Sequence, residues 1–337
     1  MEPRLSAVVC TYNRSHYLKA VLQSLADQYL DKSQYEVIIV DNNSIDQTEQ
    51  VARSFLNRYS NFRYVREPKQ GLSYARNRGY KEARGEYIAY IDDDAKANPD
   101  WGERILNAFE TITPKPVAVG GNQQAWWERP PPKWLADFMG WIRGSKKGFL
   151  QPPYAQYGFG GYNMAIKKSI LEQFSGFLPK YGRGGNIALG EESELFHRIY
   201  QDHPYFWYDP SIEVKHRMTI SKMRLPFRIK QAFLSGIVSK QMHGASKYLV
   251  IVALMAIPFF IFILPLRVWW WRKNWQKAIF KSAVDISWAI GFLKSTVNQK
   301  FRSTSYKPKK QPKVKINLKL LIIQFRLKTR AYLFHHF

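Results

Sequence analysis

Residues 86–91, EYIAYI, lead directly into Asp92, Asp93 and Asp94. This short aromatic and aliphatic run predicts a buried strand, so the three carboxylates stand at its end. Because side chains alternate along an extended backbone, Asp92 and Asp94 point to one side and Asp93 to the other. Carboxylates this close repel one another, and a divalent cation or a hydrogen-bonded polar ligand is the usual compensation. A solvated acidic turn is the alternative to a site shared by Asp92 and Asp94.

Strands and helices alternate in the sequence before this run. Further strands are predicted over residues 5–10, 35–40 and 62–65. Helices are predicted over residues 16–29 and 73–83, and between them a helix that Ser44 or Asp46 can cap runs to about Tyr59. This alternation predicts an α/β fold with a largely parallel sheet, which binds ligands at the carboxyl ends of its strands. Asp41 and the aspartate triplet fall at two of those ends.

The regular pattern fails over residues 114–153, where tryptophans alternate with prolines. A covering loop or an irregular subdomain is expected there, with the tryptophans available for core packing or for a sugar face. Helical patterns return at residues 167–174 and 191–201.

Composition limits the class of protein. The 337 residues are 45% hydrophobic, which excludes wholesale disorder. The single cysteine, Cys10, cannot form an intramolecular disulfide, which favours a reducing compartment, and residues 1–14 do not resemble a secretory signal.

Residues 267–337 contain 17 Lys and Arg and one acidic residue, so +16 of the net charge of +25 lies in the last fifth. Anionic lipid and nucleic acid are the physical candidates for a partner of this segment.

Residues 248–266 contain no charge, and tryptophans and basic residues follow them directly. Their length approaches that of a membrane span, and Trp with Arg and Lys is typical of the membrane interface. Pro258 and Pro265 would kink a spanning helix, so a re-entrant or in-plane hairpin with residues 278–293 is a second possibility, and a buried helix pair is a third. Residues 316–334 suit an interfacial helix on anionic lipid.

Five motifs in one order connect these features. They are residues 8–14 (VVCTYNR), 39–44 (IVDNNS), 71–77 (GLSYARN, before the aspartate triplet), 160–165 (GGYNMA) and 190–195 (GEESEL). With them the chain resembles the family 2 glycosyltransferases, which are inverting nucleotide-sugar transferases of the GT-A fold. The resemblance implies a catalytic domain over residues 1–245, with a nucleotide-binding half to 113 and an acceptor and sugar half from 114. A membrane-associating helical hairpin (246–300) and a basic amphipathic tail (301–337) are expected to follow.

The resemblance also implies a nucleotide site. Asp41 would contact the base, and a carboxylate that accepts an imino hydrogen suits uracil or guanine better than adenine. A UDP-sugar is the favoured donor. Arg76 matches a position near the nucleotide and the diphosphate, although a surface salt bridge is the plain alternative. The expected nucleotide contacts are Thr11, Tyr12, Arg14, Asp41, Arg76 and Asp92, the last of these near the ribose.

The metal and the catalytic base follow from the same resemblance. Asp94 would bind Mg²⁺ or Mn²⁺, and His216 would contact the metal or diphosphate unless its role is structural. Glu191 and Glu192 stand where the family carries Glu-Asp at a helix start, the second residue being the general base. Here the second residue is Glu, whose longer arm makes Glu192 a less direct match, and a plain pair of dipole-stabilising carboxylates is the alternative.

Three further positions complete the expected site. Gly161 and Asn163 lie where relatives shape the sugar pocket, and Arg183 stands in a Gly-rich loop that could close over it. Glu194 is expected to have a structural role, as an i to i+4 partner of Arg198.

The predicted function is transfer of a sugar, of the hexosyltransferase type, to a lipid-linked or polysaccharide acceptor hydroxyl in cell-surface glycan synthesis. The expected location is the cytoplasmic face of the cell membrane, with monotopic or re-entrant attachment through residues 247–300 and no nucleic-acid partner. A nucleotidyltransferase is one alternative, but residues 11–14 are not the Gly-rich, basic phosphate loop that it needs. A non-catalytic basic protein that binds membrane or nucleic acid is another, and it leaves the aspartates and Glu191-Glu192 unexplained.

Overall fold

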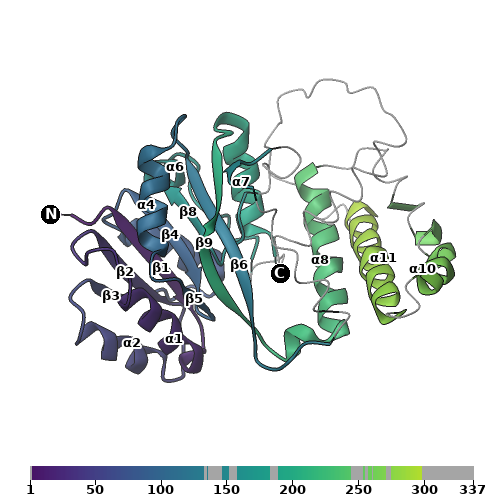
Figure 1. Ribbon diagram of the computed structural model, residues 1–337, viewed down its shortest axis with the longest axis horizontal. Coiled ribbons are helices and arrows are strands. Elements are labelled where there is room, and N and C mark those ends of the chain that lie inside the picture. The colour runs from purple at the N-terminus through teal and green to yellow at the C-terminus, as the bar shows by residue number, and fades with distance from the viewer. Residues whose placement is uncertain are drawn as a thin grey trace. The chain divides into compact units, whose positions relative to one another are not determined.

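The computed structural model describes residues 2–132, 135, 146–151, 158–182, 189–243, 253–254, 257–259, 261–270 and 275–297. The chain divides into two compact units, one of residues Met1–Glu128 and Gly140–Met218, and one of Arg129–Met139 and Thr219–Phe337 (Figure 1). The boundary after Met218 precedes the one expected at residue 245.

The first unit alternates strands with helices, as the sequence predicted. Its elements are β1 (Leu5–Thr11), α1 (Ser15–Ala26), β2 (Tyr35–Asp41), α2 (Thr48–Leu56), β3 (Phe62–Arg66), α3 (Leu72–Glu82), β4 (Tyr87–Asp92), β5 (Ala95–Ala97), α4 (Trp101–Thr111), β6 (Ala118–Trp127), β7 (Gly148–Phe149), β8 (Met164–Lys167), α6 (Lys168–Gln173), α7 (Glu191–Asp202) and β9 (Phe206–Met218).

These strands form one mixed sheet in the order β3-β2-β1-β4-β8-β6-β9-β5, and β7 pairs with β9. Strands β1 to β4 pair in parallel, whereas β8 is antiparallel to both β4 and β6. The carboxyl ends of β1, β2 and β4 therefore lie along one edge, which is the predicted position of the ligand site.

Two hydrophobic cores sandwich this sheet. Ala7 and Val9 point into the core shared with α1, α2 and α4, while Val8 between them points into the core shared with α3, α6 and α7. The alternation of side chains along a strand produces this division, and burial on both faces explains why the parallel strands read as continuous apolar runs.

Strand β6 corrects the expectation of irregular structure over residues 114–153. It lies between β8 and β9, with a register shift after Gly121. A Cβ on Gly121 would stand 1.8 Å from the carbonyl oxygen of Ile212, so the close approach of the two strands requires glycine. The sequence missed this strand because glycines and glutamines have low strand propensity and its partner β9 is distant in the chain. Trp134 and Trp141 lie outside the described residues.

The second unit contains the helices α8 (Leu225–His243), α10 (Leu264–Trp270) and α11 (Trp275–Val297), and a 3₁₀ turn at Ser221–Met223. Glycines let α8 and α11 approach closely, since a Cβ on Gly236 or Gly291 would stand 2.1 or 2.0 Å from a carbonyl oxygen of the other helix. The apolar side chains between them are buried. Helix α11 thus has α8 as its main packing partner, and residues 253, 257 and 263 join the same cluster.

Among the described residues, no helix has both the length and the apolar character needed to cross a membrane. Residues 248–266 are described only in part, and the predicted tail over 301–337 lies outside the described residues.

Candidate active site

Asp41 ends β2 and is held in place by two hydrogen bonds. Its Oδ1 accepts the backbone N–H of Ser44 at 2.8 Å, and its Oδ2 accepts the hydroxyl of Tyr64 at 2.8 Å. Burial and the hydrogen bond to Asp41 raise the pKa of Tyr64 above its usual range, so the hydroxyl remains a donor. Each carboxylate oxygen keeps a second lone pair. The arrangement orients Asp41 without exhausting its capacity to bind a ligand.

The loops that follow β1 and β2 are tied together beside Asp41. The backbone N–H of Asn13 donates to Ser44 Oγ at 2.9 Å, and the N–H of Ile45 donates to Asn13 Oδ1 at 2.8 Å. Asn13 and Asn43 have φ of 50° and 65°, a left-handed conformation that Asn tolerates better than most residues. Among the expected nucleotide contacts here, Thr11 is buried and Tyr12 is exposed. Helix α2 starts at Thr48 and follows Gln47, and Asp46 Oδ1 accepts the backbone N–H of Thr48 at 3.1 Å. Asp46 therefore binds the first residue of the helix, while Ser44 takes part in the loop contacts.

The aspartate triplet divides as the alternation of side chains predicted. Asp92, Asp94 and His216 each direct a ligand atom into one group whose atoms all lie within 4.8 Å of one another. His216 Nε2 is 2.9 Å from Asp94 Oδ1 and 3.8 Å from Asp92 Oδ2. The pairing of β5 with β9 brings His216 next to Asp94, because Ala95 of β5 lies opposite His216 of β9.

Asp93 points away from this group and pairs with Arg14. The guanidinium of Arg14 is 2.5 Å from Asp93 and 3.3 Å from Asp94. Burial raises the pKa of Asp93 to about 6 even though Arg14 opposes the shift. Arg14 therefore offsets the charge of the triplet as well as standing at the expected nucleotide pocket.

Asp92, Asp94 and His216 form a group of ligand atoms, the cation group, that fits a divalent cation. The two carboxylates offer the oxygen ligands that Mg²⁺ and Mn²⁺ prefer, and the imidazole can add a nitrogen ligand. The side chain of Asp92 is 35% exposed, so the group opens toward solvent on one side. Three protein ligands leave coordination positions for a diphosphate and water, and this arrangement suits a cation that binds together with its substrate.

Arg76 lies among carboxylates rather than on the surface. It is buried, and its Nη1 is 2.8 Å from Glu191 and 3.7 Å from Glu192, while its Nη2 is 3.8 Å from Asp92. Gly161 allows this position, since a Cβ there would stand 1.9 Å from Arg76 Nη2. Arg76 thus connects the cation group to the glutamate pair, a contact between residues 115 positions apart that the sequence did not reveal.

Glu191 and Glu192 begin α7, as predicted. The helix follows Gly190, whose φ of 92° favours glycine, and both carboxylates are buried in its first turn. Glu192 Oε1 accepts the backbone N–H of Gly161 at 3.3 Å. The predicted pairing of Glu194 with Arg198 is confirmed, at 2.8 Å.

Of the residues expected at the sugar pocket, Asn163 is held by contacts within the fold. The buried side chain of Asn163 accepts a hydrogen bond from the indole of Trp101 at 2.9 Å, and it donates to two backbone carbonyl groups. We assign Asn163 a structural role, because these contacts join the loop before β8 to α4 and β9. Arg183 lies outside the described residues.

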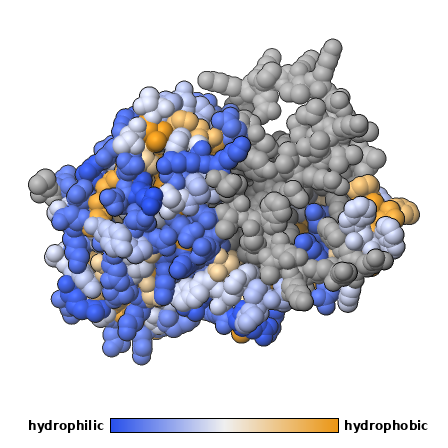
Figure 2. All heavy atoms as spheres, in the orientation of Figure 1, coloured by the Kyte–Doolittle hydropathy of each residue, from blue (hydrophilic) through white to orange (hydrophobic). Residues whose placement is uncertain are grey.

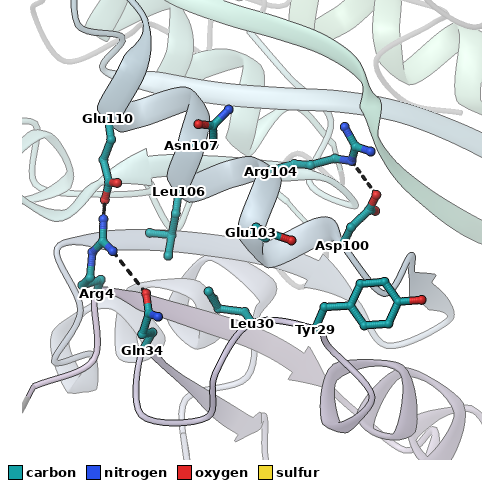
Figure 3. A pocket seen from close by; sticks show the side chains of 10 residues that line it. All are labelled: Arg4, Tyr29, Leu30, Gln34, Asp100, Glu103, Arg104, Leu106, Asn107 and Glu110. Carbon is teal, nitrogen blue, oxygen red and sulfur yellow. Dashed lines mark hydrogen bonds and ion pairs between the residues drawn. The ribbon is translucent and has the colours of Figure 1, made fainter.

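A cavity of about 630 Å³ lies at the other end of the strands (Figure 3). Its lining includes Arg4, which precedes β1 and contacts Glu110 and Gln34, and Arg104, which pairs with Asp100 at 2.6 Å. The cation group follows the carboxyl end of β4, whereas Arg4 marks the amino end of the parallel β1. None of the predicted site residues that the structure describes lines this cavity.

Comparison with known proteins agrees with the geometry. The model of the family described as glycosyl transferase family 2 matches residues 6–174. A glucosyl-dolichyl phosphate glucuronosyltransferase of Haloferax volcanii is 26% identical over 238 residues, which cover 69% of this chain and 75% of that protein. The glycosyltransferase AglE of the same organism is 36% identical over 122 residues, covering 36% and 39% of the two chains.

Two solved structures share the fold. The mannosyltransferase PcManGT from Pyrobaculum calidifontis, in complex with GDP-mannose and Mn²⁺, aligns with a TM-score of 0.57 at 17% identity, covering 99% of this chain and 86% of that one. Staphylococcus aureus TarS 1–349 with UDP-GlcNAc aligns with a TM-score of 0.52 at 14% identity, covering 85% and 90%. The chain therefore belongs to glycosyl transferase family 2 and is a glycosyltransferase with the GT-A fold.

Proposed function

We propose that this enzyme transfers a sugar, with inversion, from a nucleotide-sugar to the hydroxyl of a lipid-linked or polysaccharide acceptor. One observation carries the proposal: Arg76 joins the cation group at Asp92 to the glutamate pair on α7, at 3.8 and 2.8 Å. A diphosphate held at the cation group would then leave its sugar close to a carboxylate that can accept the acceptor's proton. Inversion follows from a single in-line displacement.

The donor half of the site favours a uridine or guanosine nucleotide. Asp41 is oriented by Tyr64 and can accept the imino hydrogen of either base. The neighbours with this fold bind GDP-mannose and UDP-GlcNAc, which supports a nucleoside diphosphate sugar as the donor class. UDP-sugars remain our first choice.

Asp94 and His216 would hold Mg²⁺ or Mn²⁺, with Asp92 at the ribose or at the cation. A bound cation would neutralise negative charge that develops on the leaving diphosphate. The protein's part is to keep these side chains together, to supply Arg14 and Arg76 as fixed positive charges, and to leave one side open for the donor.

Glu192 is the better candidate for the general base. Glu191 forms the closer ion pair with Arg76, at 2.8 Å against 3.7 Å for Glu192. A close cation stabilises the ionised form of a carboxylate and reduces its affinity for a proton. We therefore assign proton abstraction to Glu192 and the positioning of Arg76 to Glu191.

The second unit supports attachment to the cytoplasmic face of a membrane. Trp269, Trp270 and Trp275 are 68%, 77% and 51% exposed. Figure 2 shows hydrophobic residues gathered on the part of this unit that Figure 1 labels α10. Basic residues that follow these tryptophans would contact anionic lipid. The name of the Haloferax relative supports a lipid-linked acceptor, and nucleic acid is not a proposed partner.

Calorimetric titration of UDP and of GDP into detergent-purified enzyme, with Mn²⁺ and then with EDTA, tests the donor site. We expect one nucleotide to bind only with the metal, and Asp94→Ala to lose that binding. A screen of the matching sugar nucleotides against lipid-linked acceptors then identifies the transfer. If folded enzyme binds neither nucleotide, the proposed donor is wrong.

A further inference from the structure

Gln123 lies beside His216 and has no role in the site described so far. It belongs to β6, which pairs in parallel with β9, and its Nε2 is 3.2 Å from His216 Nδ1. The other ring nitrogen, Nε2, is 2.9 Å from Asp94 Oδ1. The ring of Tyr162 stacks on the imidazole at 5.5 Å between centroids and 19° between planes. The imidazole is thus held between an amide, a carboxylate and an aromatic face.

In this orientation of the Gln123 amide, the contacts favour one tautomer of His216. The Nε2 of glutamine can only donate, so His216 Nδ1 must accept in this arrangement. The proton of a neutral imidazole then resides on Nε2 and is donated to Asp94 Oδ1. His216 therefore presents an N–H, rather than a lone pair, to the group of ligand atoms.

If His216 is to bind a cation together with Asp94, its imidazole would need the opposite tautomer. An imidazole coordinates through a lone pair, so coordination at Nε2 moves the proton to Nδ1, where it needs an acceptor. Rotation of the Gln123 amide by about 180° places Oε1 at the position of Nε2 and supplies that acceptor, because the two ends of an amide have similar shape. The stacked ring of Tyr162 lets the imidazole remain in place while the amide turns.

We propose that Gln123 is a positioning residue for His216, whose side-chain amide selects the ring nitrogen that carries the proton. In the metal-free protein it stabilises the tautomer that donates to Asp94. With a cation bound, its reversed amide would accept from Nδ1–H and leave the Nε2 lone pair available to the cation. The inference rests on the proposed metal-dependent site and adds a residue that orients one of its ligands.

Metal affinity tests this role without reference to turnover. Titration of Mn²⁺, followed by the electron paramagnetic resonance signal of the free ion, is to be compared for wild type and variants in the presence of UDP. Gln123→Leu removes the acceptor and should weaken binding about tenfold or more. Gln123→Glu keeps an acceptor for Nδ1–H and should retain wild-type affinity. Gln124→Leu, an exposed position next along β6, is the matched control and should change nothing.

Nuclear magnetic resonance of ¹⁵N-labelled histidine distinguishes positioning from packing. We expect the His216 proton on Nε2 without metal and on Nδ1 with saturating Mg²⁺, and we expect Gln123→Leu to impair that change. Thermal unfolding of each variant establishes that it is folded.

The outcomes separate the two proposals. Wild-type Mn²⁺ affinity in Gln123→Leu, or a proton that stays on Nε2 in the loaded protein, overturns the role of Gln123 and leaves the proposed function standing. The same holds if Gln123→Glu loses as much affinity as Gln123→Leu. If wild type itself binds no Mn²⁺ with UDP, the metal-dependent function is wrong, and the role of Gln123 falls with it.

Discussion

Replacing Arg76 by methionine tests the electrostatic link between the cation group and the glutamate pair. Arg76 is buried, and it lies within 4.0 Å of Glu191, Glu192 and Asp92. Methionine keeps much of the apolar length of the side chain but removes the charge. The change leaves two buried carboxylates of α7 without this partner.

The burial of Arg76 determines how much unfolding free energy the substitution is expected to remove. Removing one partner of a buried ion pair typically costs about 3–5 kcal/mol, because the other charge stays in a poorly solvated place. We expect Arg76→Met to lower the free energy of unfolding by an amount in that range. Glu191→Gln should cost less, about 1–3 kcal/mol, because Arg76 keeps Glu192 and Asp92 as neighbours. In the double variant, Arg76→Met with Glu191→Gln, the buried charge of Glu191 is gone as well. The loss of unfolding free energy in the double variant should therefore be clearly smaller than the sum of the losses in the two single variants.

Urea denaturation of the purified full chain, followed by tryptophan fluorescence and circular dichroism, measures these differences. Arg78→Met is a suitable control, because Arg78 makes an exposed i to i+4 pair with Glu82 that should contribute less than about 1 kcal/mol. If Arg76→Met costs no more than Arg78→Met, or if the Arg76 and Glu191 effects simply add, the buried pair does not have the energetic role that its geometry indicates.

Three further changes test individual residues. Glu192→Gln should lower the rate of sugar transfer by about 10²–10⁴-fold and leave nucleotide binding unchanged, because only the proton acceptor is lost. Full activity of this variant in a product assay would contradict the role of Glu192 as the base. Tyr64→Phe removes one hydrogen-bond donor to Asp41 and should weaken UDP or GDP binding about fivefold, the equivalent of about 1 kcal/mol. Calorimetric titration measures this change, and an unchanged affinity would show that Asp41 does not need the hydrogen bond from Tyr64. Replacing Trp269 and Trp270 together by serine should reduce sedimentation with anionic vesicles, and an unchanged bound fraction would exclude these side chains from a membrane contact.

Several parts of the site could be predicted because they depend on local pattern. The alternation of side chains along residues 92–94 separates Asp93 from its neighbours, and the structure confirms that division. Asp41 and the triplet follow apolar runs, which placed them at strand ends before any tertiary contact was known. The start of α7 at Glu191 and the Glu194–Arg198 pair were likewise readable from helical spacing.

Contacts between distant segments depended on the tertiary structure. The meeting of His216 with Asp94, 122 positions earlier, arises from the antiparallel pairing of β5 with β9. The sequence indicated neither β6, because of its glycines and glutamines, nor the proximity of Gln123 to that histidine. Tyr64 was predicted only as part of a strand, and a surface salt bridge was the alternative to a nucleotide contact for Arg76. The periodicity of each element and the chemical groups at its ends could be predicted, since both depend on residues that are neighbours in the chain. Which of those groups share a site was decided by the order of strands in the sheet, because strand order sets which distant residues are brought within a few ångströms.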